Sequence, residues 1–424
     1  MKTAFQKKKL ANGATYITVP QDHTASATII VGFPVGSRYE EERINGISHF
    51  IEHLMFKGTK RRPTSKDITE EIDGVGAEWN AFTSKEWTVY YIKIDSNKLL
   101  LAADLLEDML FHSLFDTKEF EREKGVINEE LRMYEDTPTR TVQEEFEIIM
   151  HEGSPLGYRI GGTPEIINAL TRKDMVTYRD RFYHHDKMVV AVAGNYTDKQ
   201  SAAIASLFGK GRKKGTMPAF KKSVPAASKE RVHLKFKQTD QVHIALGFPA
   251  YKKGDPRVPA LALLQSIMGG SMSSRLFVEV REKRGLAYRV RTDIETYRDC
   301  GNTYIHAGLH TERIDEALRV IVDELRKVAK KGVTAKELAY AKGNVRGSMI
   351  LALEDSSTVA QMFLEQQLLL GKVRTPEEKL AEYEAVTRED IQKVAAEVFD
   401  FTKAKLAVIG PFETPERFES FLAE

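Results

Sequence analysis

The sequence predicts an α+β protein built from two homologous domains, each with helices packed on a mostly antiparallel sheet. Three observations predict this class. The chain has 424 residues, which is more than one domain usually holds, and its composition is 42% hydrophobic and 29% charged, as in ordinary globular proteins. Similar segments recur at a long, nearly constant spacing. Each half also mixes strand-like with helix-like segments.

Four pairs of similar segments, in the same order in both halves, indicate an internal duplication. "VGFP" at 31–34 recurs as "LGFP" 215 residues later, and "AVAG" ending at Gly194 recurs as "AVIG" ending at Gly410. "TRKDMVTYRDRFY" and "KEFEREKG" recur after 216 and 218 residues. Repetition of this kind indicates two copies of one unit. We expect domains at 1–210 and 231–424, joined by a linker at 211–230 that is polar and rich in Gly, Pro and Lys.

The elements follow from hydrophobic periodicity. Segments that alternate or run apolar with β-branched residues predict strands, at 14–19, 25–33, 88–94 and 188–194. Segments with apolar residues at helical spacing predict helices, at 97–112, 117–134 and 313–332. The last segment closes with Lys-Lys-Gly, a typical helix end.

Composition and local motifs exclude several classes of protein. The net charge of +2 gives no electrostatic footprint for nucleic acid, and no segment is apolar over the roughly 20 residues of a membrane span. Cys300 is the single cysteine, which suits a reducing compartment, and the first residues do not form a secretory signal. "DGVGAEW" and "GGSMSS" lack full nucleotide-binding fingerprints. We therefore expect a cytoplasmic protein.

The segment "INGISHFIEHLMFKG" at 44–58 places polar side chains inside an apolar helix. His49, Glu52 and His53 share one face of that helix at 3.6 residues per turn. Two imidazoles four residues apart can hold one Zn²⁺ and leave the carboxylate beside it. The alternative is a pair of satisfied core histidines, but H-x-x-E-H is a known metallopeptidase signature, that of the inverzincins.

The third ligand should come from the acidic helix "EREKGVINEELRMYEDTP" at 121–138. Acidic runs of this kind are often only solvated faces. Glu123 and Glu130 lie two turns apart on one side of this helix, whereas Glu129 points about a quarter turn away. Glu130 is therefore the predicted ligand, Glu123 an accessory carboxylate, and Glu129 the alternative ligand.

The segments "GISHFIEHLMFKGT", "EWNAFTSKEWTVYY" and "EREKGVINEELRMYEDTP" together resemble the pitrilysin family of zinc peptidases, and most of all the bacterial relatives of mitochondrial processing peptidase. The resemblance covers nearly the whole chain. It implies Zn²⁺ held by His49, His53 and Glu130, which lies 77 residues after His53. Glu52 would take a proton from the attacking water and pass it to the leaving amine. Substrate specificity is not implied.

The resemblance also implies residues that bind the substrate. "GGSMSSRLFVEVREKRGLAY" in the second half resembles the family's substrate-binding segment, with Arg281 and Tyr288 at its two functional positions. By residue pattern alone, Arg281 reads as a surface ion-pair residue and Tyr288 as a core residue. In the first half, the family's edge strand implies that Asn80, Ala81 and Phe82 contact the peptide backbone.

The family further implies a closed chamber formed by paired two-domain units, which admits small or unfolded polypeptides. Because one chain supplies two domains, we expect a homodimer in which Arg281 and Tyr288 act on the partner's metal site. The alternative is a non-catalytic subunit, or one that needs a different partner chain, in a complex like processing peptidase.

The second copy of the unit lacks the metal site. Leu264, Ile267 and Met268 stand where the first copy has His49, Glu52 and His53, and Ser348 stands opposite Glu130; the run at His184, His185 and Asp186 likewise has no counterpart with ligands. The repeat therefore predicts that the fold does not need the polar residues. A metal at the His184 run is the weaker hypothesis, since the run reads as a turn.

Overall fold

The structure is a computed structural model that describes residues 3–211 and 214–423. Arg212 and Lys213, in the predicted linker, lie outside the described residues. The chain forms two compact units. Unit 1 comprises residues 1–131, 158–221 and 350–377, and unit 2 comprises residues 132–157, 222–349 and 378–424.

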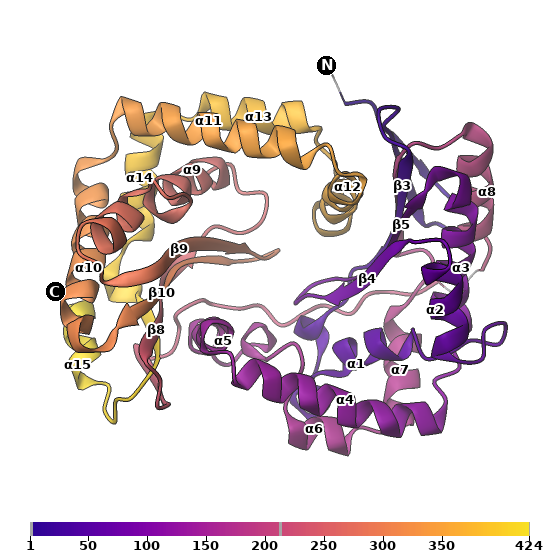
Figure 1. Ribbon diagram of the computed structural model, residues 1–424, viewed down its shortest axis with the longest axis horizontal. Helices are drawn as coiled ribbons and strands as arrows, with labels where there is room; N and C mark the ends of the chain where they lie inside the picture. The colour runs from indigo at the N-terminus through magenta and orange to yellow at the C-terminus, as the bar shows by residue number, and fades with distance from the viewer. Residues whose placement is uncertain (1–2, 212–213, 424) are drawn as a thin grey trace. The chain divides into compact units, whose positions relative to one another are not determined.

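Unit 1 contains a mixed set of strands and helices, several of which are drawn in indigo and purple in Figure 1. They are β1 (Gln6–Lys9), β2 (Thr15–Pro20), β3 (Ser26–Phe33), α1 (Ile47–Leu54), α2 (Ser65–Asp73), β4 (Glu78–Thr83), β5 (Thr88–Asp95), α3 (Leu99–His112), most of α4 (Thr117–Glu135), α6 (Pro164–Ala169), α7 (Arg172–Phe182), β6 (Val189–Gly194), α8 (Asp198–Phe208) and α12 (Ser356–Leu370).

Unit 2 contains an equivalent set. It consists of α5 (Pro138–Met150), β7 (Val232–Phe236), β8 (Gln241–Ala250), α9 (Val258–Gly269), a π-helical turn η5 (Phe277–Glu282), β9 (Ala287–Thr296), β10 (Gly301–His310), α10 (Ile314–Lys331), most of α11 (Ala335–Ala352), most of α13 (Pro376–Ala385), α14 (Arg388–Val398), β11 (Lys405–Gly410) and α15 (Glu416–Ala423).

The two sheets have equivalent strand orders, except that the sheet of unit 1 carries the additional edge strand β1. In unit 1 the order is β1-β2-β6-β3-β5-β4, and in unit 2 it is β7-β11-β8-β10-β9. Each sheet has one parallel pair, β2 with β6 and β7 with β11, and its other pairs are antiparallel. The predicted α+β class with mostly antiparallel sheets is confirmed.

The central strand β3 is buried on both faces, which explains its continuous apolar sequence. Ile29 and Val31 face a core shared with α1 and α3, whereas Ile30 faces a second core that α12 completes with Val359 and Phe363. The period of two along the strand sorts these side chains between the two cores. Figure 1 shows α3 and α12 on opposite sides of this sheet.

Helices α5 and α12 occupy equivalent places in the two halves of the sequence, and each belongs to the unit built mainly from the other half. Val142, Phe146 and Met150 of α5 pack on the sheet of unit 2, as α12 packs on the sheet of unit 1. The compact units therefore differ from the sequence halves at 1–210 and 231–424 by an exchange of helical segments.

The elements expected from periodicity lie where the sequence places them, within two residues at each end. The helix expected at 313–332 is α10, and it ends at Gly332, which has a φ of 69° and so adopts the left-handed region that a glycine tolerates. In the part of the chain that the structure describes, no helix is long and apolar enough to cross a membrane.

Candidate metal centre

Helix α1 is held at its start by a buried carboxylate. Gly46 precedes the helix with a φ of 95°, a conformation that favours glycine, and lets the chain turn into it. The carboxylate of Glu40 accepts hydrogen bonds from the Gly46 and Ser48 backbone N–H groups, at 2.7 and 2.9 Å, and from Asn45 Nδ2 at 2.8 Å. Because these N–H groups have no partner within the helix, Glu40 fixes where α1 begins. Burial raises the pKa of Glu40 to about 7.

The apolar side of α1 fixes its rotation. Phe50, Ile51 and Leu54 are fully buried, so the opposite side carries His49, Glu52 and His53. Phe50 stacks on Phe120 of α4, with ring centroids 5.1 Å apart and planes 13° apart. This contact sets α4 against α1 at the level of the polar residues.

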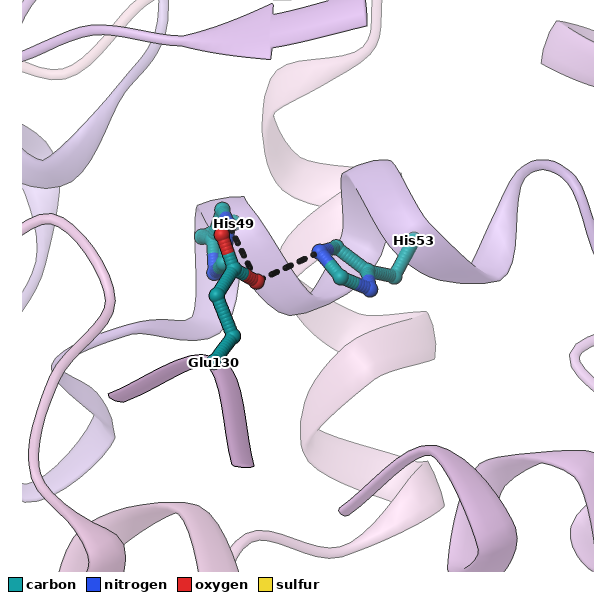
Figure 2. A group of neighbouring side chains, drawn as sticks. All are labelled: His49, His53 and Glu130. Atoms are coloured by element: carbon teal, nitrogen blue, oxygen red, sulfur yellow. Dashed lines mark ion pairs between the residues drawn. The ribbon is translucent and has the colours of Figure 1, made fainter. Parts of the chain in front are cut away.

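Figure 2 shows His49, His53 and Glu130 converging. Glu130 Oε2 lies 3.6 Å from His49 Nε2 and 3.4 Å from His53 Nε2. Tetrahedral Zn²⁺ with bonds of about 2.05 Å separates its ligand atoms by about 3.3 Å, so this donor set fits the ion. Among the described residues, this is the one group of His, Cys, Asp and Glu side chains arranged to hold a metal.

Glu123 holds the imidazole of His53 in position through a hydrogen bond. Its carboxylate is buried, and Oε1 lies 2.8 Å from His53 Nδ1 while Oε2 lies 2.7 Å from Lys57 Nζ. Although burial opposes ionisation, the hydrogen bonds from His53 and Lys57 lower the pKa of Glu123. A proton on Nδ1 would leave Nε2 of His53 free to bind a metal, as in carboxylate–histidine pairs at metal sites.

Glu52 is the carboxylate beside the donor set that is not part of it. Thr83 Oγ1, on β4, donates a hydrogen bond to Glu52 Oε2 at 2.5 Å and orients the carboxylate. Burial raises the pKa of Glu52 above its ordinary value, although the hydrogen bond from Thr83 opposes that change. Burial and the hydrogen bond from Thr83 thus set the proton affinity and the orientation of this carboxylate.

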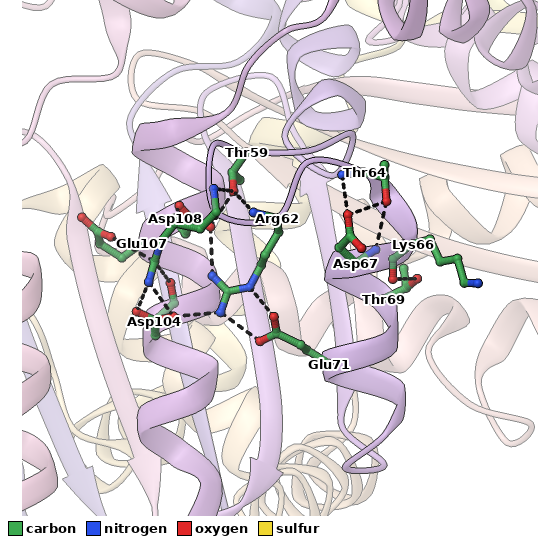
Figure 3. A network of polar contacts seen from close by, with 11 residues as sticks. Thr59, Arg62, Thr64, Lys66, Asp67, Thr69, Glu71, Asp104, Glu107 and Asp108 are labelled. Atoms are coloured by element: carbon green, nitrogen blue, oxygen red, sulfur yellow. Dashed lines mark hydrogen bonds and ion pairs between the residues drawn. The ribbon is translucent and has the colours of Figure 1, made fainter.

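A polar network anchors the loop that follows α1, as Figure 3 shows. Asp108 of α3 is fully buried and accepts hydrogen bonds from Thr59 Oγ1 at 2.6 Å and Arg62 Nη1 at 2.9 Å. Arg62 also forms a two-bond pair with Glu71 of α2 and reaches Asp104. These contacts fix the loop between α1 and α2 to the helices α2 and α3.

The predicted substrate-binding strand, β4, is one of the two edge strands of the sheet of unit 1. β4 pairs with β5 on one side, from Glu78 opposite Lys93 to Thr83 opposite Thr88. Asn80 is exposed and Ala81 is buried, and the Asn80 side-chain oxygen accepts a hydrogen bond from the Ala81 N–H at 2.8 Å. An edge strand offers unpaired backbone groups to an extended peptide.

Arg281 and Tyr288 lie together in unit 2, at two local irregularities. Arg281 belongs to the π-helical turn η5, and its Nη1 donates to the Tyr288 carbonyl oxygen at 2.9 Å. The register between β9 and β10 shifts from Gly308 opposite Arg289 to Leu309 opposite Ala287, so Tyr288 is the extra residue of a β-bulge. Tyr288 is 74% exposed and is therefore not a core residue. π-Turns and bulges often mark functional sites.

The structure thus assembles His49, His53, Glu130, Glu52 and Glu123, while Glu129 is exposed and lies outside the donor group. His184, His185 and Asp186 lie in or beside a turn before β6. Sequence reasoning missed three residues with a role in this geometry, namely Thr83, Lys57 and Glu40. No spacing pattern could reveal Thr83 or Glu40, whereas Lys57, four residues after His53, lies about one helical turn further along.

Comparison with known proteins identifies the family. The model described as insulinase (peptidase family M16) matches residues 16–164, and the model described as peptidase M16 inactive domain matches residues 169–345. A protein of Bacillus subtilis named as an uncharacterized zinc protease is 37% identical over 400 residues, covering 94% of this chain and 97% of that protein. A similarly named protein of Streptomyces coelicolor is 36% identical over 417 residues, covering 96% of this chain and 90% of that protein.

Solved structures agree on the fold. A protease from Helicobacter pylori superposes with a TM-score of 0.90 at 24% identity, covering 97% of this chain and all of that one. An M16-like peptidase from Alicyclobacillus acidocaldarius superposes with a TM-score of 0.84 at 19% identity, covering 97% of this chain and 99% of that one. On the family models, the identities and their coverage, the chain belongs to peptidase family M16, the insulinase or pitrilysin family.

Proposed function

We propose that the protein is a zinc-dependent endopeptidase that hydrolyses peptide bonds in small or unfolded polypeptides. The observation that carries the proposal is the donor set of His49, His53 and Glu130, whose separations suit Zn²⁺, with the carboxylate of Glu52 left beside it. The names of the bacterial relatives support both the metal and the reaction.

Each residue has a part in the proposed reaction. Bound Zn²⁺ would supply Lewis acidity to the water and to the scissile carbonyl. Glu52, held by Thr83, takes the proton of the attacking water and delivers it to the leaving amine. Glu123 keeps His53 oriented. The peptide pairs with β4 in an extended form, so affinity depends on its backbone more than on its sequence.

Arg281 and Tyr288 complete the proposed site from unit 2. Tyr288 donates a hydrogen bond to the oxygen on which negative charge develops, and Arg281 holds substrate carbonyls with its fork of N–H groups. The proposal includes a homodimer that encloses a chamber, in which these residues serve the partner's metal site. The single cysteine, Cys300, supports a reducing compartment such as the cytoplasm for this activity.

One experiment tests the chemistry directly. Purified wild-type protein should contain about one equivalent of zinc and cleave an unfolded peptide, with the activity lost to a chelator and restored by zinc. Glu52→Gln should keep the zinc and lose cleavage. Wild-type protein with full zinc that cleaves no member of a peptide panel would instead favour a non-catalytic subunit, or one dependent on another partner chain.

A second experiment tests sharing between subunits. Glu52→Gln and Arg281→Ala proteins are each expected to be inactive. After subunit exchange, mixed dimers hold one site with both wild-type residues, so activity should return to about a quarter of the wild-type level for equal mixing, since half of the dimers are mixed and each has one working site of two. No recovery after exchange verified by mass spectrometry would rule out shared sites.

A further inference from the structure

A cavity of about 390 Å³ lies beside Tyr288 in unit 2, and no residue of it other than Tyr288 has a part in the proposed reaction. It opens between the first turns of α5 and the strands β8, β10 and β9. Its polar lining includes Arg140, Gln143, His243, Tyr288, Arg289 and His306. Among the residues that the structure describes, no aspartate or glutamate lines it.

The floor of the cavity is one row of three residues across the sheet. Gly308 of β10 stands directly opposite His243 on β8 and opposite Arg289 on β9. Directly opposed residues project from the same face of a sheet, so His243 and Arg289 flank the position where Gly308 has no side chain. A Cβ built on Gly308 would lie 2.6 Å from Gln241 Oε1. Because Gly308 has no side chain, β10 places none between His243 and Arg289.

The β-bulge directs Arg289 into this cavity together with Tyr288. Consecutive residues of a regular strand face opposite sides of the sheet, whereas a bulge changes this alternation and re-aims a side chain. Both Tyr288 and Arg289 line the cavity. The residue proposed to contact the scissile bond thus adjoins a cation that points into the same space.

The charges of the lining are only partly balanced. Arg140 pairs with Glu144 at 3.6 Å and His306 with Asp293 at 2.9 Å. Arg289, among the described residues, forms no ion pair within 4 Å. The Nδ1 atom of His243 is buried without a hydrogen-bond partner, and burial lowers the pKa of this histidine. A buried polar atom of this kind is costly unless a ligand satisfies it.

We propose that this cavity binds a carboxylate group of the peptide substrate. The carboxylate accepts hydrogen bonds from the guanidinium of Arg289 and from the imidazole of His243. An oxygen-rich anion fits because a guanidinium can donate two parallel hydrogen bonds to a carboxylate. The carboxylate can be the C-terminus of a short peptide or an acidic side chain. The inference rests on the proposed peptidase function and adds to it a selectivity for one group of the substrate.

The test measures binding without turnover. Full-length Glu52→Gln protein is titrated with fluorescent peptides of one sequence that end in a carboxylate or an amide, and that carry Glu or Gln at single internal positions. In one of these two comparisons, C-terminal carboxylate against amide or internal Glu against Gln, the peptide with the carboxylate should bind more tightly than its neutral counterpart. Adding Arg289→Gln should weaken binding of that charged peptide about tenfold and leave the neutral peptide unchanged.

Arg291→Gln is the matched control, because Arg291 is an exposed arginine of the same strand outside the lining. Gly308→Ala, which narrows the floor, should lower the preference as Arg289→Gln does. Equal weakening of charged and neutral peptides, or no preference in the parent protein, refutes the inference. Wild-type protein that cleaves neutral peptides without any carboxylate preference refutes only this inference; a preference retained without zinc-dependent cleavage refutes only the peptidase function.

Discussion

Replacing Glu123 by glutamine should weaken zinc binding by about ten- to a hundredfold while leaving the fold in place. The carboxylate is 2% exposed and its two oxygens contact different partners, His53 Nδ1 at 2.8 Å and Lys57 Nζ at 2.7 Å. Glutamine has the same shape but one acceptor oxygen, so its NH₂ group must face one of these donors. One charge-assisted hydrogen bond is therefore lost, at a cost of about 1.5–3 kcal/mol, which corresponds to the predicted loss of affinity.

Competition with a chromophoric chelator of known affinity measures this effect. Glu121→Gln is the matched control, since Glu121 is an exposed glutamate of the same helix that pairs with Lys124. With zinc in excess, Glu123→Gln should regain part of its kcat/KM, because His53 is still present but less firmly oriented. Zinc affinity within about twofold of wild type, in a variant with unchanged circular dichroism, would refute the bracing role of Glu123.

Three further perturbations follow from the surroundings of α1. Thr83→Val removes the hydrogen bond that orients Glu52, so kcat should fall about tenfold at nearly constant zinc content, measured by steady-state cleavage and metal analysis. Asp108→Asn leaves the buried Arg62 less well paired and should lower the free energy of unfolding by about 3 kcal/mol, measured by urea denaturation. Glu40 has a pKa raised to about 7, so its contribution to stability is fully present below about pH 4.5 and is lost as pH rises to 7. Wild type should therefore lose about 3 kcal/mol over that range relative to Glu40→Gln.

Each of these has a clear contrary result. Unchanged kcat in Thr83→Val would show that Glu52 is oriented without Thr83. A urea midpoint for Asp108→Asn equal to that of Asp104→Asn, which alters a more exposed carboxylate of the same network, would show that burial of Asp108 adds nothing. A difference between wild type and Glu40→Gln that stays constant from pH 4.5 to 7 would show that Glu40 titrates normally.

Most of the fold could be predicted from the sequence because the dominant patterns are local or repeated in both halves. The strand β3 and the helix α10 have strong apolar periodicity, and the duplication made each half evidence for the other. The exchange of α5 and α12 between the halves was not predictable in this way. Their apolar faces, with Phe146 and Phe363, indicate that each helix packs on a sheet, but they do not indicate which of the two sheets it is.

The residues of the candidate site also fall into those that local patterns predict and those that they do not. Helical register within α1 and α4 sufficed to place His49 and His53 on one face and to prefer Glu130 over Glu129. The roles of Thr83 and Glu40 depend on contacts between segments far apart or without a periodic relation, so no local pattern contains them. Long-range polar contacts are specified by the packing of whole elements rather than by spacing.

The counterpart of α1 in the second half of the chain explains why we interpret the polar face of α1 as functional. In α9, Leu264, Ile267 and Met268 stand at the three equivalent positions and are buried in the core of unit 2. The same frame is therefore compatible with a fully apolar helix, which buries more surface and avoids the cost of desolvating two imidazoles and a carboxylate. Unit 1 keeps the more costly side chains at positions where apolar ones fit the fold. A ligand that stabilises those polar groups, bound between α1 and α4, accounts for that difference, and packing alone does not.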